Sequence, residues 1–504
     1  MGLFFTALIL YFAAAFVQVL FKNSTFRYYF LLAVTLLAGI FAGIPAFKAV
    51  RSLSSDYINF VIGKVNLTFV LDNIAAPIIL FLAVTVFLIN LNCKNYLEKS
   101  FKKDILYACT AVASVFTLMS VVNAVLFTVI FEILILSFLL LFKATKKYII
   151  ISQIGAVLIA CAFGVIYYQT GTVEFGKLFG LITPASFVMI FAGVLISACS
   201  VILSYTYYKG NDLPVFLLTG AGLPAFAYVL IRFLFLWRTP EEFISYMILV
   251  TGFFIAYKSV ITFDSSEPDF RRSVLNISYK NTGLMLIALS IAMFGMILKN
   301  LPTTACALFA VYFFIFNQII GIPALLISVR NKYGETGAVE EQAVWQKFLP
   351  SDKFYCGIFL GTILSIPPFA AFAGAGLMYS SILAGIEVKN AVFLVLLLIT
   401  LVLLFLLEVI TVRALANLFH QFNNYKKSLA NALLISGFVI VFLLAGLFPH
   451  ITVEFFVAPV FVFCGGNLFV PQVMLSNLSL INISFVLMVF AFYLLRFLLT
   501  KENK

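Results

Sequence analysis

Ionisable side chains are scarce in this sequence of 504 residues. Charged residues make up 10% of it, whereas a soluble domain typically carries about 25%. Histidine occurs only at His420 and His450, and the seven cysteines form no C-x-x-C pair, so the usual zinc and iron–sulfur spacings are absent. The sequence also lacks the G-x-x-x-x-G-K-[ST] loop that binds nucleotides. We therefore expect this chain to bind no metal and no cofactor of its own.

Apolar residues, in contrast, fill 63% of the sequence. No water-soluble core can hide this many apolar side chains, because the surface of a large domain still needs polar cover. A bilayer removes that requirement, and about 20 apolar residues in a helix cross its roughly 30 Å hydrocarbon core. We therefore predict an all-α, polytopic bundle of transmembrane helices and exclude a soluble enzyme.

Apolar runs divided by charged or turn-forming residues predict about fourteen transmembrane helices, some of them interfacial or broken. They begin near residues 2, 28, 74, 105, 123, 148, 179, 213, 243, 282, 304, 354, 390, 429 and 485. The first run, residues 2–21, has no basic start and no small-residue cleavage site, so we interpret it as a helix and not as a signal peptide. The longest polar segments, 51–66, 264–272 and 330–346, are too short to fold alone.

The net charge of +12 comes from lysines and arginines in short loops between apolar runs. Basic groups at 94–103 and at 143–147 are two helices apart and therefore share a side of the membrane, together with Lys22 and Arg27. The positive-inside rule places that side in the cytoplasm and the amino terminus outside. Because this rule already explains the basic loops, we expect no nucleic-acid partner.

Prolines within apolar runs predict local interruptions of helices. Pro224 and Pro323 stand alone, which is typical of a kink that neighbouring helices tolerate. The pair Pro367-Pro368 lies among glycines and favours a real break. Transporters use such discontinuous helices near the middle of the bilayer.

Three ionisable residues lie well inside apolar runs, where a charge costs at least about 2.5–3.5 kcal/mol and needs a reason. They are Glu132, Arg232 and Glu408. A buried Glu132 is typical both of a proton carrier and of a structural ion-pair partner, and the sequence leaves both alternatives open. For Glu408 we favour a structural or interfacial role, because Arg413 follows it and indicates a helix end.

Five segments between residues 60 and 390 carry motifs in a fixed order. Asp72 lies in VNLTFVLDNIAAPIILF, Glu132 in FEILILSFLLLF and Arg232 in AFAYVLIRFLF. The segment DFRRSVLNISYKNTGLMLIALS keeps six residues of the pattern D-[LI]-K-R-[LI]-x-A-Y-S-S-[IV]-x-[NH]-x-G, namely Asp269, Arg271, Arg272, Ser278, Asn281 and Gly283. The segment LSIPPFAAFAGAGLMYSSIL keeps Pro367, Pro368, Phe372 and Gly374 of G-L-P-P-x-x-G-F-x-[SG]-[KE].

In this order the segments resemble the antiporter-like membrane subunits of respiratory complex I, of energy-converting hydrogenases and of multi-subunit sodium/proton antiporters. The resemblance implies two inverted five-helix repeats, each with a broken helix, and a row of charged residues that passes protons. We therefore expect one membrane domain over residues 1–504. Within it we expect N-terminal helices in 1–104, a first repeat in 105–240, a second repeat in 241–415 and C-terminal helices in 416–504.

The sequence departs from that family along the charged row. Where the family has lysine or histidine, this chain has Ser197 in the stretch FAGVLISACSV, Pro224, then Phe313 and Asn317, and finally Ala375. Of the implied row only Glu132 clearly survives. Arg232, Lys280 and Glu408 are the charged residues that remain as substitute candidates for a proton path.

We therefore predict an antiporter-like membrane-arm subunit of a complex-I-related NADH–quinone oxidoreductase or of a membrane-bound hydrogenase. It would be a non-catalytic part of a redox-driven proton or sodium translocase. Its partners would be the lipid bilayer and other membrane-arm and redox subunits, in the inner (plasma) membrane of a prokaryote. One hypothesis is that it passes protons through Glu132 and water. The other, which the lost lysines favour, is a scaffold with a closed channel.

The alternative class is a stand-alone secondary transporter or a lipid-linked polysaccharide flippase. Both have a similar number of apolar helices. A flippase, however, needs several charged residues around a central cavity, and this sequence offers too few.

Overall fold

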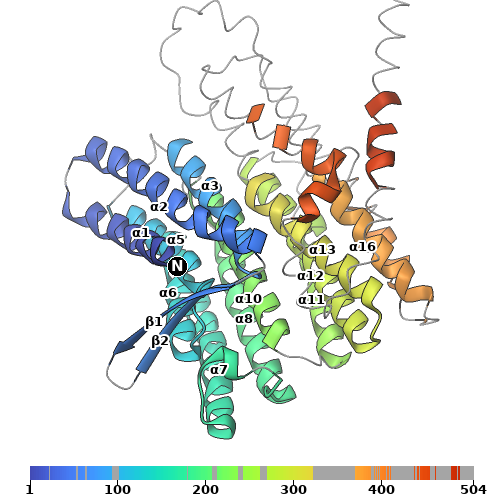
Figure 1. The fold of residues 1–504 in the computed structure, drawn as a ribbon, viewed down its shortest axis with the longest axis horizontal. Coiled ribbons are helices and arrows are strands. Elements are labelled where there is room, and N and C mark those ends of the chain that lie inside the picture. Colours follow the sequence, from blue (N-terminus) through green and yellow to red (C-terminus); the bar gives the residue numbers. More distant parts are fainter. Residues whose placement is uncertain are drawn as a thin grey trace, which may run out of the picture. The chain divides into compact units, whose positions relative to one another are not determined.

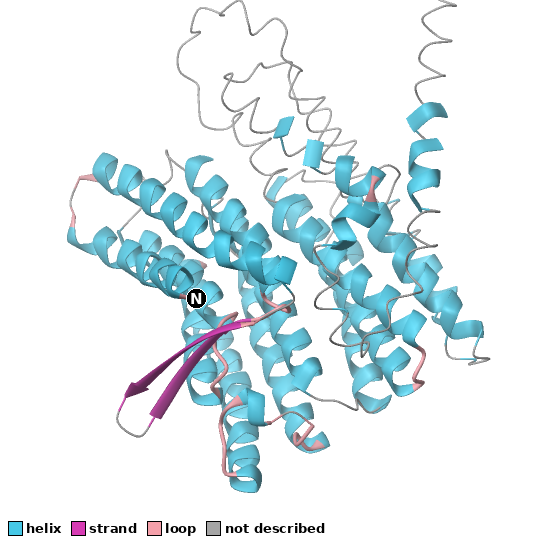
Figure 2. Cartoon of the chain, in the orientation of Figure 1, coloured by secondary structure: helices cyan, strands magenta, loops and turns pink. Residues whose placement is uncertain are grey.

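The computed structural model describes residues 1–321, except for short gaps, then residues 369–387 and separate stretches of 391–488. The gaps in the first part fall at residues 22, 53–54, 63–64, 93–101, 179, 207–212, 237–241 and 262–269. Most of the described chain is helical, and a single two-stranded hairpin accompanies the described helices (Figure 2). Eight of the described helices are long and apolar enough to cross a membrane, so the predicted polytopic helical class is confirmed.

The chain divides into two compact units. The first unit comprises Met1–Met247 with Gln318–Pro323, and the second comprises Ile248–Asn317 with Ala324–Lys504. Each unit has its own packed interior, and each is considered by itself below. The predicted repeats and their boundaries remain predictions.

The first unit is built from antiparallel neighbours along the chain (Figure 1). Its helices are α1 (Gly2–Leu20), α2 (Ser24–Ser52), α3 (Ala76–Asn92), α5 (Lys102–Leu118), α6 (Ala124–Leu141), α7 (Lys146–Thr170), α8 (Pro184–Thr206), α9 (Leu213–Leu217) and α10 (Leu223–Leu236). Helix α1 packs on α2 and α5, α2 on α3, and α7 on α8. A short 3-10 turn, η1 (Phe175–Lys177), follows α7.

The hairpin follows α2 and begins within the polar segment 51–66, for which no strand is predicted from the sequence. Strand β1 (Asp56–Ile62) pairs antiparallel with β2 (Val65–Leu71), so that Asp56 faces Leu71. The end of β2 also bonds to the segment after α5, where the Val70 N–H donates to the Ser120 carbonyl oxygen at 2.7 Å. Five of the seven residues of DYINFVI are aromatic or β-branched, which favours a strand.

Local capping explains where several helices begin and end. The Asn123 side chain accepts hydrogen bonds from the N–H groups of Val125 and Leu126, which satisfies free donors in the first turn of α6. Helix α7 ends at Gly171, whose φ of 69° is the left-handed conformation that glycine adopts without a steric penalty. These two residues set the direction of α6 and α7, which carry the candidate site.

A π-helical segment, η2 (Leu218–Gly222), joins α9 to α10, and Pro224 is the second residue of α10. The apolar span Leu213–Leu234 continues through this proline. The wider π turn lies next to the residue that lacks a backbone donor, in keeping with a tolerated distortion. Pro323 and the pair Pro367-Pro368 lie outside the described residues.

The first broken helix is not found where the resemblance implies it. The stretch FAGVLISACSV, residues 191–201, lies within the continuous helix α8. This part of the expectation is wrong. The stretch carries no proline, and its small residues Gly193 and Ser197 both pack against α7, so nothing in it interrupts the helix.

The second unit contains α11 (Glu242–Ile261), within which the division between the units falls, α12 (Phe270–Ile297), α13 (Leu301–Phe316) and α16 (Ala370–Glu387). The π-helical segment η3 (Asn317–Gly321) follows α13, and its residues from Gln318 onward belong to the first unit. Helix α13 packs on both α12 and α16. Asn300 caps α13 by accepting from the Thr303 N–H, and its side-chain amide donates to the Ala384 carbonyl oxygen of α16 at 2.9 Å. One residue therefore both starts α13 and ties it to α16.

Candidate functional site

Glu132 lies in the middle of α6 and accepts a hydrogen bond from the side-chain amide of Gln153 on α7. Its other oxygen, Oε2, is buried and has no hydrogen-bond partner among the described residues. Gln153 carries no charge. The carboxyl group is therefore tied to a neutral neighbour, and this contact provides no cation to balance a carboxylate.

The side chain of Glu132 lies on the outward face of α6. Val125, Val129 and Leu140 are exposed on the same helix, at 60%, 49% and 42%, and helical spacing places Glu132 within their stripe. Across α7 the neighbours of Gln153 continue this surface, since Ile150 and Ile154 are also exposed. Glu132 is thus half-buried at the edge of the first unit and does not point into its centre.

Ser197, which occupies the position where the family has a lysine, is fully buried on α8. Its hydroxyl donates to the Ser152 carbonyl oxygen of α7 at 3.3 Å. A Cβ added at Gly155 would lie 2.5 Å from the Gly193 carbonyl oxygen, and one at Gly193 would lie 2.6 Å from that of Gly155. Small residues therefore let the backbones of α7 and α8 approach closely, as membrane helices often do. No room remains there for a lysine side chain.

Arg232 of α10 forms a buried ion pair with Asp72, which lies between β2 and α3. The other carboxylate oxygen of Asp72 accepts from the N–H groups of Ile74 at 3.1 Å and Ala75 at 2.9 Å. Asp72 therefore both caps the turn before α3 and neutralises Arg232. One turn before Arg232, the Tyr228 hydroxyl donates to the Met119 carbonyl oxygen at 2.9 Å. These contacts give Arg232 a structural role between α10 and the start of α3.

Four phenylalanine rings form a cluster that sequence reasoning did not identify. Phe127 of α6, Phe163 of α7, Phe175 of η1 and Phe233 of α10 are all in mutual contact, with ring centroids 5.2–6.2 Å apart. We call these four residues the aromatic cluster. Rings at such distances pack without space for water between them. The cluster therefore fills the space between α6, α7 and α10 with dry apolar surface.

Lys280 belongs to the second unit, where it is buried on α12 with 2% of its surface exposed. The adjacent Asn281 side chain donates to the Phe314 carbonyl oxygen of α13 at 2.8 Å. Tyr279 precedes Lys280 in the sequence, and the centre of its ring lies 5.1 Å from the Lys258 ammonium of α11. Lys280 is thus a buried lysine within this unit, and its part in a proton path remains a prediction.

The remaining site candidates from the sequence contribute no described charged group. Glu408 lies outside the described residues. Phe313, Asn317 and Ala375, which occupy other positions of the lost row, are buried and uncharged. Among the described residues no group of three or more His, Cys, Asp or Glu side chains is arranged to hold a metal ion.

Comparison with known proteins adds evidence on the fold. No family model and no curated protein matches the sequence. Among solved structures, a chain of the membrane-bound sulfane sulfur reductase, an archaeal respiratory membrane complex, aligns with a TM-score of 0.71 at 15% identity, over 92% of this chain and 97% of that one. A chain of respiratory complex I from Thermus thermophilus aligns with a TM-score of 0.65 at 13% identity, over 93% and 100%.

The Mrp complex from Dietzia sp. DQ12-45-1b is also similar, with a TM-score of 0.70 at 15% identity. Its chain is longer, since the alignment covers 99% of this chain but 57% of that one. At these identities the likeness establishes the shared fold. The resemblance predicted from the sequence motifs is therefore confirmed at the level of the fold.

Proposed function

We propose that this chain is an antiporter-like membrane-arm subunit of a multi-subunit complex related to respiratory complex I, and that it serves mainly as a scaffold. Its partners would be other membrane-arm and redox subunits of an NADH–quinone oxidoreductase or a hydrogenase-type complex in the plasma membrane of a prokaryote. The fold shared with chains of three membrane complexes supports this proposal. The amino terminus would face outside and the basic loops the cytoplasm.

The surroundings of Glu132 carry the proposal that proton transfer is weak or lost. A proton path needs titratable groups or ordered water within hydrogen-bond reach along its whole length. Glu132 contacts the neutral Gln153, and the nearby seam between α7 and α8 is closed by Gly155, Gly193 and Ser197. With no room for a lysine in that seam, Glu132 has no cation there to pass a proton to or from.

Two further features support a closed first unit. The ion pair between Asp72 and Arg232 occupies the arginine, and the aromatic cluster leaves no wet passage between α6, α7 and α10. The outward position of Glu132 also indicates a protein partner. A carboxyl group facing hydrocarbon costs at least about 2.5–3.5 kcal/mol, so this face is more stable when a neighbouring subunit covers it.

Replacing Glu132 by Gln tests the scaffold role. The intact complex carrying E132Q is reconstituted in proteoliposomes, and the protons moved per electron transferred are measured. A scaffold predicts the same ratio as the wild type, because Gln keeps a polar partner for Gln153. Glu174→Gln, in an exposed pair with Lys177, is the matched control for loss of one carboxylate. A collapse of the ratio in E132Q alone would show that Glu132 carries protons.

Co-purification tests the assembly itself. An affinity-tagged chain extracted in mild detergent should bring down partners whose sequences hold iron–sulfur or quinone-binding motifs. The identity of those partners distinguishes an NADH–quinone oxidoreductase from a hydrogenase or a sodium/proton antiporter. Recovery of a solitary monomer that is active in liposomes would contradict the proposal and favour a stand-alone transporter.

A further inference from the structure

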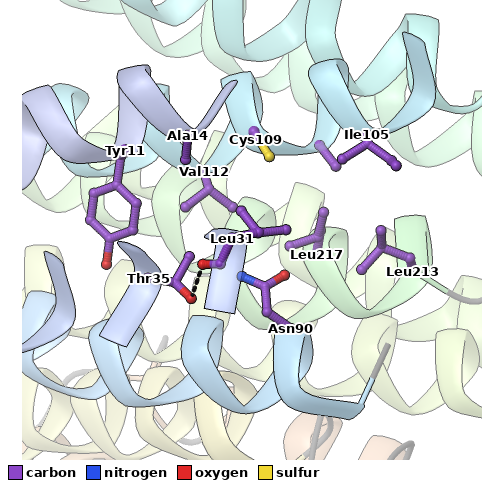
Figure 3. A pocket seen from close by; sticks show the side chains of 11 residues that line it. Tyr11, Ala14, Leu31, Thr35, Asn90, Ile105, Cys109, Val112, Leu213 and Leu217 are labelled. Atoms are coloured by element: carbon purple, nitrogen blue, oxygen red, sulfur yellow. Dashed lines mark hydrogen bonds between the residues drawn. The ribbon is translucent and has the colours of Figure 1, made fainter. Parts of the chain in front are cut away.

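A small, partly open cavity lies among the N-terminal helices, away from Glu132. It is lined by residues of α1, α2, α3, α5 and α9, all within the first unit (Figure 3). The centre of a water molecule can move within about 20 Å³ of it. About 10–15 Å³ measured in this way holds one water molecule, so the cavity is too small for a lipid chain or a quinone.

One polar group at this cavity is buried and has no partner. Tyr11 of α1 is 2% exposed, and its hydroxyl has no hydrogen-bond partner among the described residues. Asn90 of α3 is 8% exposed and lines the same cavity. In a membrane-embedded bundle, a buried donor or acceptor without a partner costs several kcal/mol. The Tyr11 hydroxyl, in a cavity that also presents the Asn90 amide, therefore points to a polar occupant.

The side chains are also held in place around the cavity. The Tyr11 ring stacks on Phe116 of α5, with centroids 4.5 Å apart and planes inclined by 20°, which fixes the direction of its hydroxyl. Thr35 of α2 donates to the Leu31 carbonyl oxygen at 2.8 Å, so its oxygen keeps lone pairs for a further donor (Figure 3). Together Tyr11, Thr35 and Asn90 supply both donors and acceptors to one small space.

We propose that this cavity is a binding site for ordered water, in which one or two water molecules bridge Tyr11, Thr35 and Asn90. Buried water molecules typically make about three hydrogen bonds to the polar groups around them, which matches the three polar side chains of this lining. The site joins α1, α2 and α3 through hydrogen bonds to water, in addition to the direct bonds from Gln18 to Arg27 and from Tyr28 to Leu91. It lies outside the row of charged residues implied by the sequence motifs and does not depend on the proposed function.

Hydroxyl-radical footprinting with X-rays tests the site, because radicals form from bound water inside a protein as well as at its surface. The full-length protein is irradiated in nanodiscs, and oxidation of individual tyrosines is followed by mass spectrometry. Tyr228 is the matched control, since it is 1% exposed and its hydroxyl is already bonded to Met119. Tyr11 should be oxidised several-fold faster than Tyr228. Equal rates would overturn the proposal.

The Tyr11→Phe substitution gives a second test, because the direction of its effect on the midpoint of thermal unfolding shows whether the cavity holds water. If water bridges the site, Tyr11→Phe removes a satisfied hydroxyl and lowers the midpoint of thermal unfolding. If the cavity is dry, the same change removes an unsatisfied hydroxyl, so the midpoint stays the same or rises, and the proposal is wrong. Tyr228→Phe removes a known hydrogen bond and must lower the midpoint in either case, which proves that the assay detects the loss of one bond.

Discussion

The ion pair between Asp72 and Arg232 allows a test of how the first unit is held together. Asp72→Asn removes the negative charge but keeps a side-chain oxygen to cap the turn before α3, because Asn and Asp are comparable caps. Arg232→Met keeps a long apolar side chain and removes the positive charge. Each single variant removes one charge of the buried ion pair.

The expected loss of unfolding free energy follows from removing one member of a buried ion pair. Breaking a buried ion pair by removing one partner typically costs about 3–5 kcal/mol, whereas replacing both partners costs much less. We therefore expect each single variant to lose about 3–5 kcal/mol of the free energy of unfolding. The double variant D72N/R232M should lose less than the sum, with a coupling free energy of about 1–3 kcal/mol.

The assay is unfolding of the purified chain in mixed micelles with increasing SDS, followed by circular dichroism. Lys177→Met is the control, because its pair with Glu174, at 2.8 Å, is on the surface, with 66% of the Lys177 side chain exposed. Such a pair contributes at most about 1 kcal/mol. The structural role of Arg232 would be refuted by single variants no more costly than this control, or by a double variant that costs the full sum.

Two further predictions concern packing in the first unit. Gly155→Leu should lower the free energy of unfolding by about 1–3 kcal/mol or more, because its side chain would meet the α8 backbone. Gly164→Leu on the same helix has open space around its Cβ and should change the midpoint of thermal or SDS-induced unfolding little. Equal losses in the two variants would disprove the close packing of α7 against α8. Phe233→Ala should cost about 3–5 kcal/mol in SDS titration by opening a cavity in the aromatic cluster, and a loss below that of Lys177→Met would show that the cluster is not tightly packed.

Much of the helical plan could be predicted from apolar runs alone. The predicted starts near residues 123, 213 and 243 lie within one residue of α6, α9 and α11. The start predicted near 282 is late by a full three turns, since α12 begins at Phe270. That first part of α12 has the polar sequence FRRSVLNISYKN, and a count of apolar residues excludes it even though it is helical.

The candidate site was harder to predict, because its character depends on contacts between distant segments. Asp72 and Arg232 both stand out in the sequence, but nothing in their spacing indicates that they form a pair. Glu132 was recognised as an intramembrane carboxyl group, yet its neutral partner Gln153 and its outward direction depend on how α6 and α7 pack. The aromatic cluster draws on four elements and gives no local signal.

The pairing of Asp72 with Arg232 also has an electrical consequence. A single elementary charge within the hydrocarbon layer feels about 2.3 kcal/mol per 100 mV of membrane potential. Because the two opposite charges lie at one depth, the field does almost no net work on the pair. An energised membrane therefore neither tightens nor loosens the link between α10 and the start of α3. Loss of either residue would turn this voltage-neutral joint into one whose stability varies with the membrane potential.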